Sequence, residues 1–321
     1  MSRLSIKSAQ CAKIMGTGSY LPTRLITNTD LEKTLDTTHA WIVERTGICQ
    51  RYLVGEGEST ASMAVMAARR ALEAAQLKTV DMIIVATTTP DAFFPSTACL
   101  VQAELNLLGC PAFDIAAACA GFNYALGIAD QFIRTGQIKT VLVIGSETMS
   151  RVLDWQDRST CILFGDGAGA VVLSASTTPG ILGSQLHADG THQDLLYINN
   201  FRLPDPRILK MDGAAVFRHA VNKMGDTLLT SLMQHKIHIE QLDWLIPHQA
   251  NLRIIRLLAK KLKLPESRVV VTIDQQANTS SASVPLALDT AVRDGRIQPG
   301  HLLLLESFGG GFVWGSTLMR Y

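Results

Sequence analysis

Residues 111–126 read PAFDIAAACAGFNYAL, and this stretch decides the fold. Its apolar run at 112–115 predicts a buried strand, and the apolar residues after Cys119 have helical spacing. The small residues between them predict a sharp turn with the thiol at the helix start. Helix N-terminal amides favour an anion, so we expect a lowered pKa and a nucleophilic Cys119. A lone cysteine in an apolar run also fits a buried structural role.

Composition limits the class of protein. The chain has 321 residues, of which 47% are hydrophobic and 18% charged, so it can form a large packed α/β core. A net charge of +1 favours no nucleic-acid partner. The six cysteines show no zinc spacing, the start (MSRLSIKSAQCAK) resembles no signal peptide, and no apolar run is long enough for a membrane span. We therefore expect a cytoplasmic protein with reduced thiols, no metal site and no membrane association.

Apolar runs and helical periodicity predict an alternation of strands and helices. The near-continuous apolar runs at 82–87 and 141–145 are typical of strands covered by helices on both faces. Further strands are expected at 13–20, 171–174, 242–248, 269–273, 301–305 and 312–319, and helices at 28–35, 60–77, 93–108, 120–136, 216–235, 252–262 and 282–293. The glycine-rich run 161–170 leads into a strand, whereas a dinucleotide-binding loop opens a helix, so we expect a tight hairpin there.

The two halves of the chain run in parallel at an offset of roughly 160 residues. Segment 82–89 corresponds to 242–249, the strand ending at Cys119 to 269–278, and 141–146 to 302–307. The sequence thus predicts a flexible extension (1–11), a first half with the nucleophile (12–175), an irregular connection (176–215) and a second half (216–321). Cys119 and Asn278 would lie at equivalent strand-to-helix corners that meet in one pocket.

Seven motifs together resemble the thiolase superfamily and, within it, the β-ketoacyl-acyl-carrier-protein synthase III family, over residues 13–321. They are GTGSYLP (16–22), WIVERTGI (41–48), AAACAGF (116–122), FGDGAGA (164–170), PHQANLRII (247–255), NTSSASVP (278–285) and FGGGFVWG (308–315). The resemblance implies a duplicated, layered α-β-α-β-α fold and a homodimer. It also implies the initiating condensation of type II fatty acid synthesis, with an acyl-coenzyme A substrate and no permanently bound cofactor.

The resemblance assigns roles to three residues. Cys119 would take the acyl group from acyl-CoA, with acetyl-CoA as the expected primer. Malonyl-loaded acyl carrier protein would then lose carbon dioxide, and His248 and Asn278 would donate hydrogen bonds to the resulting enolate. The enolate carbon would attack the acyl-cysteine and give a 3-oxoacyl carrier protein.

Further roles follow from the same resemblance. Gly310 would supply an oxyanion-hole amide, Phe308 an apolar wall beside the departing carboxylate, and Phe94 a contact in the partner subunit's acyl pocket. Trp41 would stack on the adenine of CoA, and the CoA site would also include Arg45, Arg158 and Asn251. Ala214 stands where relatives often carry an Asn that meets the CoA arm, so the sequence leaves that contact open.

A cationic face is expected on the helix after His248, from its three- and four-residue spacing of basic residues. Such a face is either merely solvated or steers an acidic carrier protein. Its members are Arg253, Arg256, Lys260, Lys261 and Lys263, with Arg218 extending it.

Three other interpretations stay open at this point. A cysteine protease or thioester hydrolase would also use Cys, His and Asn. A non-catalytic binding subunit would retain the fold alone. A specialised relative would prime polyketide or quinolone synthesis or condense long acyl chains. Primer length and branching are not fixed by the sequence.

Overall fold

Two sheets form the framework of the protein. The structure is a computed structural model and describes residues 11–198 and 208–321. The first sheet has the strand order β1 (Cys11–Tyr20), β7 (Asp166–Ser176), β6 (Thr140–Thr148), β4 (Met82–Ala86) and β5 (Ala112–Ile115). The second has the order β8 (Ile181–Ala188), β13 (Val313–Arg320), β12 (Leu302–Gly309) and β11 (Trp244–Pro247). Strand β4 is parallel to β5 and β6, and β11 is parallel to β12, whereas the remaining pairs in both sheets are antiparallel.

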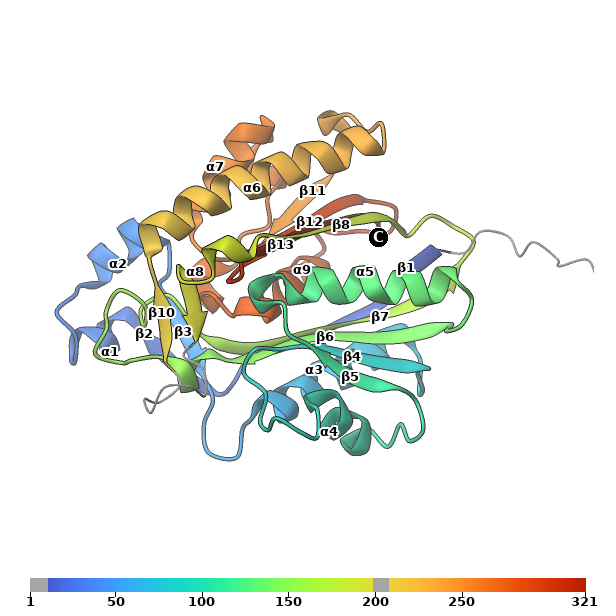
Figure 1. The fold of residues 1–321 in the computed structure, drawn as a ribbon, viewed down its shortest axis with the longest axis horizontal. Helices are drawn as coiled ribbons and strands as arrows, with labels where there is room; N and C mark the ends of the chain where they lie inside the picture. The colour runs from blue at the N-terminus through green and yellow to red at the C-terminus, as the bar shows by residue number, and fades with distance from the viewer. Residues whose placement is uncertain (1–10, 199–207) are drawn as a thin grey trace, which may run out of the picture.

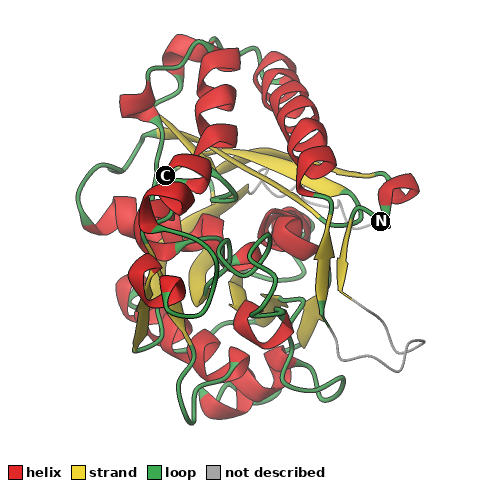
Figure 2. Ribbon diagram, turned by 90° about the vertical axis from the view of Figure 1, so that its left-hand side faces the viewer, coloured by secondary structure: helices red, strands yellow, loops and turns green. Residues whose placement is uncertain are grey.

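Helices cover both faces of each sheet and make five layers (Figure 1). The central layer between the sheets consists of α5 (Gly121–Arg134) and α9 (Ser283–Arg293). One outer layer holds α3 (Thr60–Ala75) and α4 (Thr97–Glu104), and the other holds α6 (Gly213–Gln234) and α7 (Leu252–Leu262). Figure 2, turned by 90°, shows helices between and outside the strands. The expected α-β-α-β-α fold is thus confirmed.

The strand orders confirm the internal duplication. Strands β1, β7, β6 and β4 correspond in order and direction to β8, β13, β12 and β11. Next to β11, where the first sheet has β5, Val269 forms an isolated parallel bridge with Leu245. The predicted strand 269–273 is therefore reduced to this bridge, and α8 (Ile273–Gln276) follows at once.

Smaller elements complete the fold around the second half. Strand β2 (Arg24–Thr27) pairs antiparallel with β3 (Gln50–Leu53). In the sequence, α1 (Asn28–Glu32) and α2 (His39–Thr46) lie between these two strands. Strands β9 (Leu196–Ile198) and β10 (Leu209–Met211) pair beside α6. None of the helices in the described ranges is long and apolar enough to cross a bilayer.

Local sequence signals place most helix ends. Ser59 caps α3, because its side chain accepts the Ser62 N–H in a capping box, and Asn251 caps α7 by accepting the Arg253 N–H. Helix α7 has the predicted bounds. The predicted helix 93–108 is shorter, since α4 begins only after its cap Ser96, behind the proline at 95.

The connection expected at residues 176–215 contains regular structure in its described part, and residues 199–207 lie outside the described residues. Residues 181–188 form β8, which pairs with β13 at the edge of the second sheet. Its side chains are mostly half-buried or exposed, so the strand lacks the apolar pattern that identifies a buried one. Residues 1–10 of the expected extension lie outside the described residues, and Cys11 already belongs to β1.

The second part of the glycine-rich run 161–170, from Asp166 on, belongs to a strand and not to the expected hairpin. Strand β7 begins at Asp166, and its glycines lie where α9 packs against the sheet. A Cβ at Gly169 would lie 2.7 Å from both the Leu286 amide nitrogen and the Pro285 Cβ. Glycine is therefore required here by close packing between a strand and a helix.

We expect Gly169→Ala to lower the free energy of unfolding by about 1–3 kcal/mol, because the added methyl overpacks the contact with α9. Urea denaturation of the variant measures this loss. Gly190→Ala is the matched control, since a Cβ there meets no atom within 4 Å. Equal stability of the two variants would contradict the packing argument.

Candidate active site

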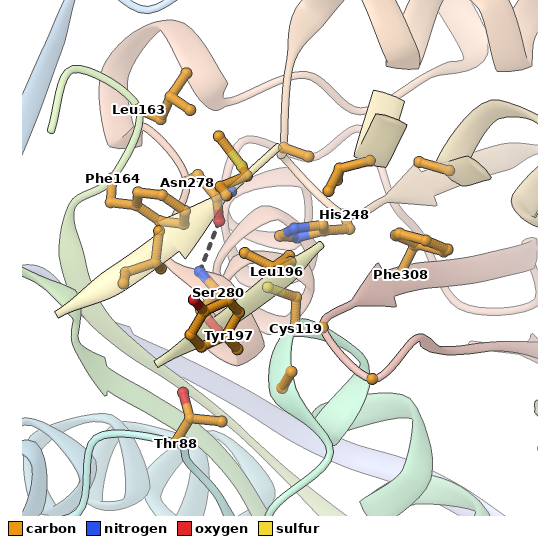
Figure 3. A pocket seen from close by; sticks show the side chains of 18 of the residues that line it. Thr88, Cys119, Leu163, Phe164, Leu196, Tyr197, His248, Asn278, Ser280 and Phe308 are labelled. Atoms are coloured by element: carbon orange, nitrogen blue, oxygen red, sulfur yellow. Dashed lines mark hydrogen bonds between the residues drawn. The ribbon is translucent and has the colours of Figure 1, made fainter. Parts of the chain in front are cut away.

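A cavity of about 530 Å³ lies where the two halves meet, a size typical of small-molecule sites. Its walls are largely apolar, and the side chains of Cys119, His248, Asn278 and Ser280 gather around it (Figure 3). Other lining residues include Thr88, Ala116, Met149, Phe164, Leu196, Tyr197, Met211, Phe217, Met224, Asn251, Phe308, Gly310 and Gly311. The cavity thus combines an apolar wall with a few convergent polar groups.

Cys119 lies in a short 3-10 turn, Ala118–Ala120, between β5 and α5. The preceding Ala118 has φ +41°, a left-handed conformation that makes the corner sharp. A Cβ on Gly309 would lie 2.6 Å from the Cys119 amide nitrogen. Glycine at 309 is therefore what lets the 309–311 segment approach the cysteine backbone.

The expected lowering of the Cys119 pKa is wrong. Burial raises the pKa of this thiol to about 12, and the negative charge of Glu147 adds to the rise. A hydrogen bond from Ser280 acts in the opposite direction but is the smaller effect. Desolvation in the interior outweighs the helix N-terminus, so the resting group is a neutral thiol.

His248 follows β11 directly and is 2% exposed. Its Nδ1 lies 2.5 Å from Ser283 Oγ, and its backbone N–H donates to the Glu306 carbonyl. Because Ser283 occupies Nδ1, Nε2 is the ring nitrogen left for a ligand. Burial lowers the pKa of His248 to about 3, so the imidazole is neutral at physiological pH.

Asn278 is fixed through its backbone and its side chain. Its N–H donates to the Leu163 carbonyl, and its own carbonyl accepts the Gly165 N–H. The side-chain Oδ1 accepts the Ser280 N–H at 2.9 Å, which leaves the NH₂ group as the donor for a ligand. The site therefore presents a thiol and two uncharged polar groups to one cavity.

Trp41, Arg45 and Arg158 form a separate cluster. The guanidinium carbons lie 4.7 and 5.2 Å from the Trp41 ring centroid, and Arg158 also pairs with Asp36. This cluster does not line the cavity. Asn251 connects the two regions, because it lines the cavity and donates from Nδ2 to the Arg45 carbonyl.

The predicted cationic side chains on α7 are exposed, as is Arg218 on α6. Arg253 lies over the ring of Phe217, a cavity residue, so this face adjoins the cavity. Lys261 pairs with Asp226 of α6, and Arg256 lies 3.5 Å from Glu266.

Phe94 and Ala214 do not line the cavity. Phe94 is 85% exposed, on the loop before α4, and its predicted contact involves a partner subunit. Ala214 is exposed in the first turn of α6.

Several site residues were missed by the sequence analysis. Ser280 and Ser283 belong to the quoted segment NTSSASVP, but their partners are distant in sequence. Glu147 follows an apolar strand run and gave no signal, although it lies immediately behind the cavity residues Thr88 and Ser280. The sequence could not assign Glu147 to the site, because only the structure shows that it contacts cavity residues.

A thiol opposite two neutral donors, in an apolar cavity between duplicated halves, defines the class: a condensing acyltransferase of thiolase-like fold. Comparisons with known proteins narrow the class. The family described as 3-oxoacyl-[acyl-carrier-protein] synthase III matches residues 113–190, and its C-terminal counterpart matches residues 232–321. The chain belongs to this family.

Several individual proteins that are similar to this chain carry the name of the same family. A β-ketoacyl-[acyl-carrier-protein] synthase III of Thioalkalivibrio sulfidiphilus is 55% identical over 97% of this chain and 99% of its own length. Crystal structures of the corresponding enzymes from Aquifex aeolicus and Pseudomonas aeruginosa are 48% and 41% identical, each with a TM-score of 0.93. Both cover 97% of this chain, and the chain covers 100% and 98% of theirs, respectively. A priming ketosynthase of the R1128 polyketide pathway is 36% identical, with a TM-score of 0.94 and 99% coverage of both chains.

The buried neutral His248 makes stability depend on pH. Its pKa is about 3 when folded and 6.5 in its ordinary state, so the unfolded chain binds one more proton between these values. Stability from this group is present above pH 6.5 and is lost as the pH falls, by about 1.4 kcal/mol per unit. We expect urea denaturation at pH 7, 6 and 5 to show a shallower loss in His248→Asn than in the wild type. An exposed control, His238→Asn, should keep the wild-type slope; equal slopes in all three proteins would contradict the assignment.

Proposed function

We propose that this protein initiates type II fatty acid synthesis by a two-step condensation at Cys119, with acetyl-CoA as primer. The observation that carries the proposal is the joint placement of Cys119, His248 and Asn278 around one cavity. Membership of the synthase III family agrees with this chemistry.

In the first step the Cys119 sulfur attacks the thioester carbonyl of acyl-CoA. A carbon–sulfur bond forms, and the Cys119 thiol loses its proton. CoA leaves with the electron pair of the broken bond and takes up one proton in exchange. The oxyanion is stabilised by backbone amides, for which we propose those of Cys119 and Gly310. The close approach of the glycine segment to the Cys119 amide supports this pairing.

In the second step malonyl-carrier protein loses its carboxylate as carbon dioxide and forms an enolate. We propose that His248 Nε2–H and the Asn278 NH₂ group donate to the enolate oxygen. This role needs the tautomer in which the Ser283 hydroxyl donates to Nδ1. The enolate carbon attacks the acyl carbon, Cys119 leaves as a thiolate, and the product is a 3-oxoacyl carrier protein. Phe308, 4% exposed, supplies the apolar wall that disfavours the charged carboxylate.

Two surfaces serve the two substrates in this proposal. The cluster of Trp41, Arg45 and Arg158 takes the adenine and phosphates of CoA, since an aromatic ring flanked by guanidinium groups suits both. The cationic face on α7, with Arg218, receives the acidic carrier protein. We further propose a cytoplasmic homodimer in which Phe94 reaches the partner's acyl pocket. Six free thiols fit a reducing compartment.

Incubation with acetyl-CoA should add one acetyl group to the wild type. It should add no thioester-linked acetyl group to Cys119→Ala or Cys119→Ser, because both lack the thiol. Intact mass spectrometry measures the adduct. Malonyl-carrier protein should then remove it with release of carbon dioxide. Labelling by longer or branched acyl-CoAs alone would keep the reaction and replace the primer, as in a specialised priming synthase. No labelling by any acyl-CoA would overturn the proposal.

Substitutions in the two substrate surfaces should affect the KM values of different substrates. Trp41→Ala should raise the KM for acetyl-CoA roughly tenfold, since loss of base stacking costs about 1–3 kcal/mol. The double variant Arg218→Glu/Lys260→Glu should raise the KM for malonyl-carrier protein about tenfold at low salt, with little effect on acetyl-CoA. The double variant Lys78→Glu/Lys236→Glu, at two exposed lysines, is the charge-matched control. A similar response of both substrates to either variant would contradict the assignment.

A further inference from the structure

The backbone immediately before Asn278 is strained. Ala277 has φ +57° and ψ −163°, a conformation that is essentially restricted to glycine. A strained conformation of this kind persists only where the surrounding structure holds it in place. Ala277 donates its N–H to the Ile273 carbonyl, but this bond lies before the strained dihedral angles. The position of Asn278 therefore depends on what holds the chain after Ala277.

Asn278 is held by the segment 162–165. Its backbone N–H donates to the Leu163 carbonyl at 3.0 Å, and its carbonyl accepts the Gly165 N–H at 3.0 Å. Phe164 and Asn278 thereby form an isolated parallel bridge at the cavity, where both side chains are seen in Figure 3. Because the bridge belongs to no longer ladder, it keeps Asn278 in place only if the segment 162–165 is itself fixed.

Arg51 of β3 fixes this segment at both of its ends. The Arg51 side chain is fully buried, and its Nη2 donates to the Ile162 carbonyl at 2.8 Å. At the other end, a Cβ on Gly165 would lie 3.1 Å from the Arg51 Cβ. The second guanidinium nitrogen, Nη1, donates to Asn28 Oδ1 at 2.8 Å, and Asn28 is anchored in turn by donating from Nδ2 to the Ile48 carbonyl.

The guanidinium of Arg51 is a buried charge bonded to neutral acceptors. Within residues 11–198 and 208–321, no carboxylate pairs with it. Burial lowers the pKa of Arg51 to about 10, so the group stays charged at neutral pH. A buried charge without an ion-pair partner is costly, and an apolar side chain would avoid that cost. What arginine contributes here is its planar fork, which holds two acceptors in a fixed geometry.

We propose that Arg51 is a positioning residue for Asn278. It holds the segment 162–165, and this segment keeps the Asn278 NH₂ group directed at the enolate oxygen against the strain at Ala277. The inference rests on the proposed function, in which Asn278 donates to the enolate in the second step. Arg51 does not line the cavity, so its loss should slow the second step and leave acylation of Cys119 intact.

The test compares the two steps in Arg51→Met. Acetylation of Cys119 at saturating acetyl-CoA is followed by intact mass, and the second step by release of carbon dioxide from malonyl-carrier protein on the acetylated enzyme. We expect acetylation within about twofold of the wild type and release that is roughly ten- to hundredfold slower, because a displacement of about 1 Å can cost a hundredfold in rate. Arg134→Met is the matched control and should keep both rates, since Arg134 also donates to a carbonyl, that of Ile181 at 2.7 Å, but lies in the last turn of α5.

Two further variants separate positioning from folding. Arg51→Lys keeps the buried charge without the fork, so it should show the same selective loss of the second step. Adding Ala277→Gly to Arg51→Met should restore part of the lost rate, because glycine adopts this conformation without strain. Thermal melts report folding. A fall of both rates together, no recovery with Ala277→Gly, or failure of both Arg51 variants to fold would overturn the positioning role.

Asn278→Ala distinguishes failure of this inference from failure of the proposed function. It should be acetylated normally and release carbon dioxide roughly a hundredfold more slowly, the usual cost of losing one donor to an oxyanion. Release at the wild-type rate would contradict the proposed role of Asn278 itself. Slow release by Asn278→Ala together with wild-type release by both Arg51 variants would leave the proposed function standing and overturn the role of Arg51.

Discussion

The site depends on the contact of two strand-to-helix corners at the centre of the molecule. The strands of the opposite half also lie close to these corners. A Cβ at Gly145 of β6 would lie 2.4 Å from the Ser281 carbonyl oxygen, and one at Gly309 of β12 would lie 2.6 Å from the Cys119 amide nitrogen. No side chain fits at either position, so each corner packs against the backbone of a strand from the other half. The side chains of Cys119, His248 and Asn278 thereby stand on rigid elements from both halves and face one cavity.

Burial at this contact decides the charge state of the site. The thiol and the imidazole are both driven to their neutral forms, the first by a raised pKa and the second by a lowered one. In the proposed condensation, neutral donors suit an enolate that forms only during the reaction, since an imidazolium would instead attract the malonyl carboxylate that must leave. The same burial disfavours the thiolate form of Cys119.

The layered fold can be predicted from the sequence because apolar runs that form strands, such as 141–146 and 302–307, repeat at a constant offset. Clear periodicity also predicts helices such as 252–262. The grouping of Cys119, His248 and Asn278 around one cavity can be predicted from the sequence motifs in which they lie. The pKa of Cys119 cannot, because it depends on burial and on Glu147, whose neighbours are distant in sequence. Strand β8 is missed for a related reason: an edge strand takes its hydrogen bonds from β13 and needs no apolar pattern.

Duplication places matching corners together, and the two copies have diverged in what they contribute. Ala118 and Ser280 each adopt positive φ and open a 3-10 turn before a central helix. The first corner supplies the thiol. The second supplies, at the position of the alanine, the Ser280 hydroxyl, which donates to the Glu147 carboxylate of the first half. His248 is held by Ser283, within the second half alone. The hydrogen bond from Ser280 to Glu147 therefore crosses between the halves, whereas His248 and Asn278 both come from the second half.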